Sequence, residues 1–218
     1  MRKSIISFLN NKFIEGGILL TVSNFLNGFL NYLFNSLSGK ILGPAKYGEI
    51  TALFSYLFIT SVPMAVLLTD ILRRLGQAGK EKYITVKMWE QWMLQKLHRW
   101  KFFFILYLFL TFPVAYVTNL SVLFSFTLLS ILLLSFISVF YTSTLLGLQL
   151  FFGYTLVTLI STITKLLGPI LIYFRLDGLT TIAFFLVAST AALIVGGKIL
   201  LTRTLKKTKK VRPVSSKR

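Results

Sequence analysis

Four asparagines at helical spacing in one apolar segment are the first candidates for chemistry. They are Asn24, Asn27, Asn31 and Asn35. At about 100° per residue they occupy an arc of roughly 80° on one helix face. Unpaired amides in hydrocarbon cost several kcal/mol each, so this face must meet other helices or water. Hydrogen-bonded packing between helices is one interpretation. A polar wall along a wet cavity is the other, and four amides in register favour it.

Lys165, in the segment STITKLLGPILIY, is the second candidate. If a span covers residues 153–174, Lys165 lies about 18 Å from its start and about 14 Å from its end. A cation at that depth indicates a functional site that faces the protein interior, with an anionic group as one partner. If the helix begins several residues later, Lys165 becomes an ordinary flanking lysine.

Arg73 and Arg74 form the third candidate site. They follow Asp70 by three and four residues, which is the spacing of an ion pair on a helix. The same guanidinium groups suit the oxygens of a phosphate at the mouth of a pathway. The sequence does not separate these two roles.

The chain lacks the residue combinations on which most enzymes depend. It has no cysteine and one histidine, so the common metal sites are not expected. No pair of carboxylates lies close together in an apolar segment, and there is no glycine-rich phosphate loop. We therefore expect no enzyme, no catalytic residue, no metal and no cofactor.

The elements that position these residues follow from hydrophobicity. The chain is 55% hydrophobic, and its mean hydropathy of +0.76 is typical of membrane proteins. Windows of about 20 apolar residues recur, each long enough to cross a hydrocarbon core of about 30 Å. We predict an all-α integral membrane protein, a bundle of six transmembrane helices within residues 1–201. The predicted spans cover residues 17–38, 47–72, 102–117, 122–146, 153–174 and 181–201.

The distribution of basic residues predicts the orientation. The formal net charge is +18, and most of the lysines and arginines lie before the first span, between the second and third, or after the last. Basic loops stay in the cytoplasm during insertion, so we expect both termini to be cytoplasmic. Attraction to anionic headgroups explains the same charge, and nucleic acid is therefore not an expected partner.

Two further segments accompany the spans. Residues 84–100 place apolar side chains, including Trp89 and Met93, at helical spacing and predict a helix in the cytoplasmic interface. Its histidine, His98, has no second ligand in the chain and is expected to be an interfacial side chain. Residues 202–218 are basic and polar, and we expect a disordered cytoplasmic tail.

Two short motifs lie between predicted spans. ILGPAKYGEI, residues 41–50, contains Gly43 and Pro44, which predict a helix-terminating turn, and Gly48, which is expected to allow close packing. TLLGLQLFFGY, residues 144–154, joins the fourth and fifth spans. Together with the polar first span and the basic loop, these motifs resemble the polysaccharide and lipid-linked oligosaccharide flippases of the MATE-like (MOP) superfamily. The resemblance covers about residues 16–201.

The resemblance implies one six-helix lobe, the N-terminal one, of a two-lobed transporter in the plasma membrane. It implies translocation of lipid-linked oligosaccharide or polysaccharide precursors by alternating access. The four asparagines would meet sugar hydroxyls, and Lys165 with Arg73 or Arg74 would meet the lipid-linked pyrophosphate. A second six-helix lobe or a homo-oligomer would complete the cavity among the membrane lipids. A MATE-like exporter of small molecules or lipids, and a non-transporting scaffold or fragment, are the alternatives.

Overall fold

The computed structural model describes residues 12–99, 101–174 and 177–211, and this part of the chain is helical with no strands. The all-α prediction is confirmed. The elements in chain order are α2 (Lys12–Gln77), the 3₁₀ turn η1 (Gly79–Glu81), α3 (Lys82–Arg99), α4 (Lys101–Thr118), α5 (Val122–Gly147), α6 (Phe151–Tyr173) and α7 (Gly178–Val211).

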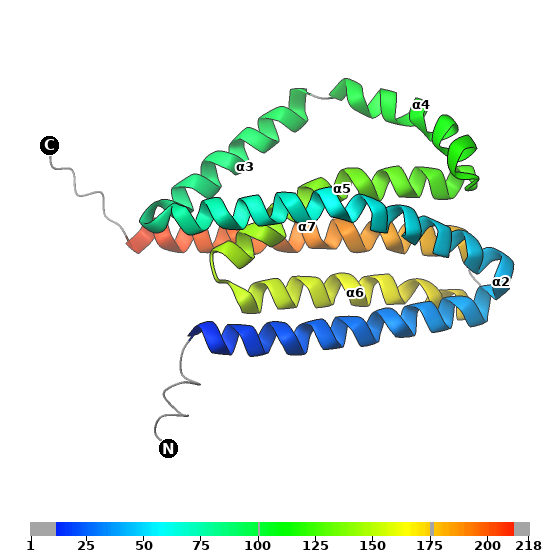
Figure 1. Ribbon diagram of the computed structural model, residues 1–218, viewed down its shortest axis with the longest axis horizontal. Helices are drawn as coiled ribbons and strands as arrows, with labels where there is room; N and C mark the ends of the chain where they lie inside the picture. The colour runs from blue at the N-terminus through cyan, green and yellow to red at the C-terminus, as the bar shows by residue number, and fades with distance from the viewer. Residues whose placement is uncertain (1–11, 100, 175–176, 212–218) are drawn as a thin grey trace, which may run out of the picture.

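The long helix α2 is a hairpin of two helical arms. Gly43, with φ 74° and ψ 172°, is its non-helical residue, and Pro44 follows it. Only glycine adopts this backbone conformation at low cost, and a proline disfavours the helical conformation of the residue before it. Residues 12–42 form the first arm and residues 44–77 the second arm, and the two run in opposite directions (Figure 1). The predicted turn is confirmed.

Four helices are long and apolar enough to cross a membrane, among the residues that the structure describes. Their apolar parts are Ile14–Gln77, Val122–Gly147, Phe151–Tyr173 and Gly178–Lys206. The first contains the hairpin, and each of its arms exceeds the length of about 20 residues that a crossing requires. In α4 the described apolar part, Phe109–Thr118, is shorter. The chain is therefore a helical membrane protein.

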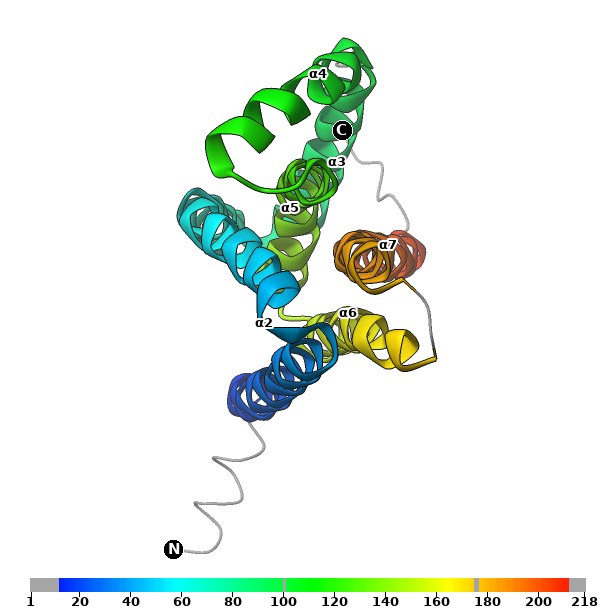
Figure 2. The same cartoon turned by 90° about the vertical axis from the view of Figure 1, so that its right-hand side faces the viewer.

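The helices pack as a bundle with an arch on one side. The first arm contacts α6, the second arm contacts α5, and α7 packs against both α5 and α6 (Figure 2). In Figure 1, α3 and α4 form the arch over α5. The described chain begins at Lys12 and ends at Val211 at the same end of the bundle, opposite the hairpin turn.

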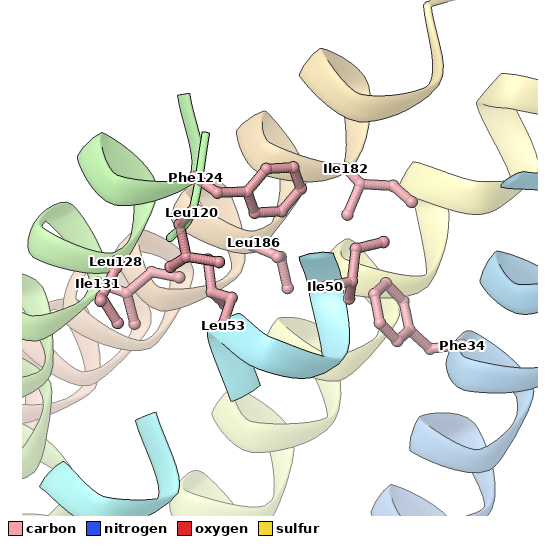
Figure 3. Close-up of a cluster of buried hydrophobic side chains, with 9 residues drawn as sticks. All are labelled: Phe34, Ile50, Leu53, Leu120, Phe124, Leu128, Ile131, Ile182 and Leu186. Carbon is pink, nitrogen blue, oxygen red and sulfur yellow. The ribbon is translucent and has the colours of Figure 1, made fainter. Parts of the chain in front are cut away.

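Two hydrophobic clusters stabilise the ends of the bundle. The first core cluster lies near the hairpin turn and joins both arms to α5 and α7 (Figure 3). Its buried members are Phe34, Ile50, Leu53, Leu120, Phe124, Leu128, Ile131, Ile182 and Leu186. The second core cluster joins the second arm, α3, α5 and α7 at the other end. Its buried members are Leu75, Val86, Phe140, Tyr141, Leu148 and Leu201.

The end of α7 differs from the sequence-based expectation. The last span was expected to end at residue 201, yet α7 continues to Val211 and covers the first ten residues of the segment expected to be disordered. Leu201 is fully buried in the second core cluster, and Leu205 packs against it. These contacts, with the good helix propensity of the lysines that follow, account for the extension. Residues 212–218 lie outside the described part of the chain.

Two further predictions concern α3 and Gly48. The helix predicted over residues 84–100 is present as α3 as far as Arg99, and its Trp89 and Met93 pack against the second core cluster. The reason is that α5 offers them a protein surface. Gly48 was expected to allow close packing, but a Cβ atom at that position would meet no atom within 4 Å. The short connection between α5 and α6 lies as predicted, with Gln149 at φ 59°.

Candidate functional site

A line of hydrogen bonds joins the first arm to α6, and we call it the polar seam. Asn27 lies at its centre. Its Oδ1 accepts a hydrogen bond of 2.6 Å from the hydroxyl of Thr162, and its Nδ2 lies 3.4 Å from the hydroxyls of Thr158 and Ser23. Thr158 and Thr162 are one turn apart on α6, so one amide spans both.

Asn31 connects this pair to the lysine of α6. Its Nδ2 donates a hydrogen bond of 2.8 Å to the backbone oxygen of Asn27. Its Oδ1 accepts a hydrogen bond of 2.8 Å from Nζ of Lys165. The structure therefore brings together three residues that the sequence singled out separately, Asn27, Asn31 and Lys165.

The remaining surroundings of Lys165 are aromatic. Its Nζ lies 4.4 Å from the ring centre of Phe34 on the first arm and 4.6 Å from that of Phe54 on the second arm. The two rings meet edge to face, with their centres 5.9 Å apart. Ring faces attract a cation, and this attraction strengthens where water is excluded. Lys165 thus touches both arms of the hairpin.

Lys165 has no carboxylate partner. All six carboxylates of the chain lie in the part that the structure describes, and the ion pair found there is between Asp70 and Arg74. A cation in a bundle of membrane-spanning helices is costly unless something compensates its charge. Here an amide oxygen and two aromatic rings compensate it in part. An anionic group would complete the compensation.

Lys165 lies inside its helix, well away from both ends. It follows Phe151, the first residue of α6, by 14 residues and precedes Tyr173, the last one, by eight. At 1.5 Å per residue these separations are about 21 Å and about 12 Å. The alternative of a helix that begins several residues later, with Lys165 as a flanking residue, is excluded by this boundary.

Asn24 and Asn35, the other two of the four asparagines on this helix face, are not part of the polar seam. Asn24 and Asn35 are exposed, whereas Asn27 and Asn31 are half-buried. All four side chains nevertheless leave the helix within the same arc of roughly 80°. Asn27 and Asn31 therefore bond to α6, as the packing interpretation requires. Asn24 and Asn35 stay exposed, as the cavity-wall interpretation requires.

The two arginines lie far from the polar seam. Arg74 is exposed, and its Nε forms an ion pair of 2.8 Å with Oδ2 of Asp70. Arg73 is exposed as well. It follows Phe54, a neighbour of Lys165, by 19 residues on the same arm, which is about 28 Å. The structure thus does not bring Arg73 or Arg74 together with Lys165.

Four residues of this site were missed by sequence reasoning. Thr158 and Thr162 precede Lys165 by seven and three residues, and this helical spacing was a detectable signal. Phe34 and Phe54 gave no signal, because they lie among many phenylalanines in apolar segments. Only the closure of the hairpin places both rings at one lysine.

The polar seam can bind a ligand through hydrogen bonds and charge. Amides and hydroxyls donate and accept hydrogen bonds, and the lysine supplies a positive charge. Within the described ranges no three His, Cys, Asp or Glu side chains cluster in a way that could hold a metal ion. Comparisons with protein-family models, with curated proteins and with solved structures found no match for the chain.

Proposed function

We propose that this protein is one lobe of a flippase-type transporter that moves lipid-linked oligosaccharide or polysaccharide precursors across a cell membrane by alternating access. The supporting observation is Lys165. It is a cation inside a membrane-spanning helix, it bonds to an amide, and it has no carboxylate partner. A phosphate of a lipid-linked glycan would supply the missing negative charge.

The neutral part of the polar seam suits the glycan. Sugar hydroxyls both donate and accept hydrogen bonds, as do the amides of asparagine. Asn24 and Asn35, which are exposed next to the bonded pair, are the amides available to a substrate. Arg73 and Arg74, which lie about 28 Å or more along the second arm from Phe54, a neighbour of Lys165, would meet the pyrophosphate at the cytoplasmic mouth. In this proposal the arginines and Lys165 contact the substrate at different stages.

The proposed topology has six crossings with both termini in the cytoplasm. The two arms of α2 supply two crossings, α4 to α7 supply the others, and α3 lies at the cytoplasmic side. Two observations support this topology. The described ends of the chain lie at one end of the bundle, and most lysines and arginines precede the first crossing, lie between the second and the third, or follow the last.

Lys165→Ala tests the function directly, with Lys198→Ala as the matched control. Lys198 is also a lysine in an apolar part of a helix, but it is exposed and outside the polar seam. In cells that express only the Lys165 variant we expect glycan export to be lost, while the abundance of the variant in the membrane is unchanged. The Lys198 variant should export normally.

The outcomes of this experiment separate the alternatives. Normal export in the Lys165 variant would remove this residue from the mechanism. Intact glycan export in cells that lack the whole protein, together with sensitivity to amphipathic compounds, would favour an exporter of small molecules. If cells that lack the protein keep both normal glycan export and normal resistance to amphipathic compounds, a scaffold is favoured. The hydrogen bonds of Asn27 and Asn31 to α6 or within the first arm already suit that role.

The proposal also requires a second lobe, because six helices would form one side of a central cavity. Either another six-helix chain or a second copy of this one would supply it. The mass of the intact assembly, purified in mild detergent, tests this requirement. We expect a mass well above the 24.8 kDa of one chain. A protein that transports as a single chain of that mass would contradict the two-lobe arrangement.

A further inference from the structure

A groove lies between α3 and α5, on the opposite side of α5 from the polar seam. In Figure 1, α3 rises away from the bundle toward α4. The space beside its C-terminal half has a volume of about 310 Å³, and we call it the α3–α5 groove. Its lining residues are Trp92, Met93, Lys96, Leu97, Phe136 and Ile137.

The N-terminal half of α3 is held against the bundle by the protein itself. Val86 is fully buried, and Trp89 packs against the second core cluster. The hydroxyl of Tyr141, a buried residue of α5, donates a hydrogen bond of 3.2 Å to Oε1 of Glu90. Beyond Met93, which both packs against this cluster and lines the α3–α5 groove, the side chains of Lys96 and Leu97 are exposed.

The floor of the groove is apolar and belongs to a membrane-spanning helix. Phe136 is 51% exposed and lies within the apolar, membrane-spanning part of α5. It precedes Gly147, the last residue of α5, by 11 residues, which is about 17 Å. Because this depth lies within the hydrocarbon of a bilayer, an acyl chain covers such a surface better than water does.

Lys96 gives the groove one charged edge. Its Nζ lies 5.7 Å from the ring centre of Trp92, and both side chains are exposed. None of the six carboxylates of the chain forms an ion pair with Lys96, and Glu90 bonds instead to Tyr141. A lysine stem packs on apolar surface while its ammonium group extends toward the headgroups, and indole favours the boundary between headgroups and hydrocarbon.

We propose that the α3–α5 groove binds one anionic phospholipid of the surrounding bilayer. An acyl chain would lie against Phe136 and Ile137, and the phosphate would meet Lys96. An apolar surface beside one uncompensated cation complements a molecule whose negative charge adjoins its hydrocarbon chain. The lipid would attach the exposed C-terminal part of α3, beyond Met93, to the bundle. This proposal does not depend on transport.

Fluorescence quenching tests the site, because the three tryptophans of the chain lie in or next to α3. The full chain with Trp89→Phe and Trp100→Phe keeps Trp92 as its single indole. It is titrated in detergent with brominated phosphatidylglycerol or brominated phosphatidylcholine. We expect saturable quenching by the anionic lipid, with an affinity that Lys96→Gln weakens about five-fold. Lys87→Gln, the control, removes a cation from α3 outside the groove and should leave the affinity unchanged.

The thermal midpoint of the chain with all its tryptophans is the second measurement, because Trp89 contributes to the core. Phosphatidylglycerol should raise the midpoint more than phosphatidylcholine, and Lys96→Gln should remove the difference. Equal quenching and equal midpoints with both lipids would mean ordinary solvation by lipid and would overturn the proposal. Quenching that disappears as protein concentration rises would place a second copy in the groove and would also overturn it.

Discussion

At the scale of single residues, the half-buried amides of Asn27 and Asn31 show what a polar side chain contributes in a membrane bundle. A hydrogen bond between helices in lipid adds about 0.6 to 2 kcal/mol, whereas an amide without a partner costs several. The four asparagines therefore matter mainly through the cost that each would carry if left unpaired. Asn27 avoids this cost through Thr158 and Thr162 on α6, and Asn31 avoids it through Lys165.

Asn27→Leu is expected to destabilise the protein by about 1 to 3 kcal/mol, because the hydrogen bonds from the first arm to two hydroxyls of α6 are lost and these hydroxyls keep only their bonds within α6. Unfolding of the purified protein by a denaturing detergent measures the change. Asn24→Leu is the control, since Asn24 is exposed and should change stability by no more than about 0.5 kcal/mol. If both variants have the same stability as the natural chain, the polar seam does not stabilise the bundle. If Asn24→Leu retains stability but loses glycan export, the open amides contact substrate.

At the scale of the elements, the hairpin of α2 determines where everything else lies. Its turn depends on Gly43, whose φ of 74° no other residue adopts at comparable cost. The turn returns the second arm to the first, so that Phe34 and Phe54 meet at Lys165. A hairpin and a continuous helix of 66 residues would have nearly the same backbone hydrogen bonds. The difference between them is this one residue and the packing that it permits.

Gly43→Ala should therefore cost about 1 to 3 kcal/mol of stability, since alanine is strained at this backbone conformation. The thermal midpoint in detergent measures the effect. Gly17→Ala is the matched control on the same helix. A Cβ atom there would meet nothing within 4 Å, so a gain of about 0.5 to 1 kcal/mol is expected from helix propensity. Equal effects of the two substitutions would show that the turn does not require glycine.

At the scale of the whole molecule, the arrangement combines two core clusters at the ends with a polar seam between two parallel elements. The first core cluster ties the hairpin to α5 and α7, and the second ties the second arm to α3 and α7. The polar seam joins the first arm to α6, whose remaining contacts are largely with α7. The first arm therefore depends on α6 for much of its attachment to the bundle.

The proposed topology predicts which positions a membrane-impermeant thiol reagent can reach. The chain has no cysteine, so single substitutions report without background. Ser4→Cys and Ser215→Cys, near the two termini, should react only from the cytoplasmic side in oriented vesicles. Asn119→Cys, in the turn between α4 and α5, should react only from the opposite side. Reaction of Ser4→Cys and Asn119→Cys from the same side would contradict the six crossings.

Much of the fold was predictable, because a membrane imposes strong rules on sequence. Backbone groups in hydrocarbon must bond within the chain, so long apolar windows become helices. The boundaries of α5 and α6 agree with the predicted spans to within two residues. The turn at Gly43 followed from glycine and proline, whose backbone preferences are local. The extension of α7 to Val211 did not, because it depends on Leu201 and Leu205 reaching a distant cluster.

The sequence by itself determined that this chain is a helical membrane protein with four asparagines on one helix face and a lysine within an apolar segment. Hydrophobicity, spacing and backbone preference act over a few turns of one helix. Only the tertiary structure decided that Asn27 and Asn31 face α6 while Asn24 and Asn35 remain exposed. It alone placed Lys165 between two rings and separated it from Arg73. These facts depend on which helices become neighbours. Sequence patterns describe only a few turns of one helix and therefore do not identify those neighbours.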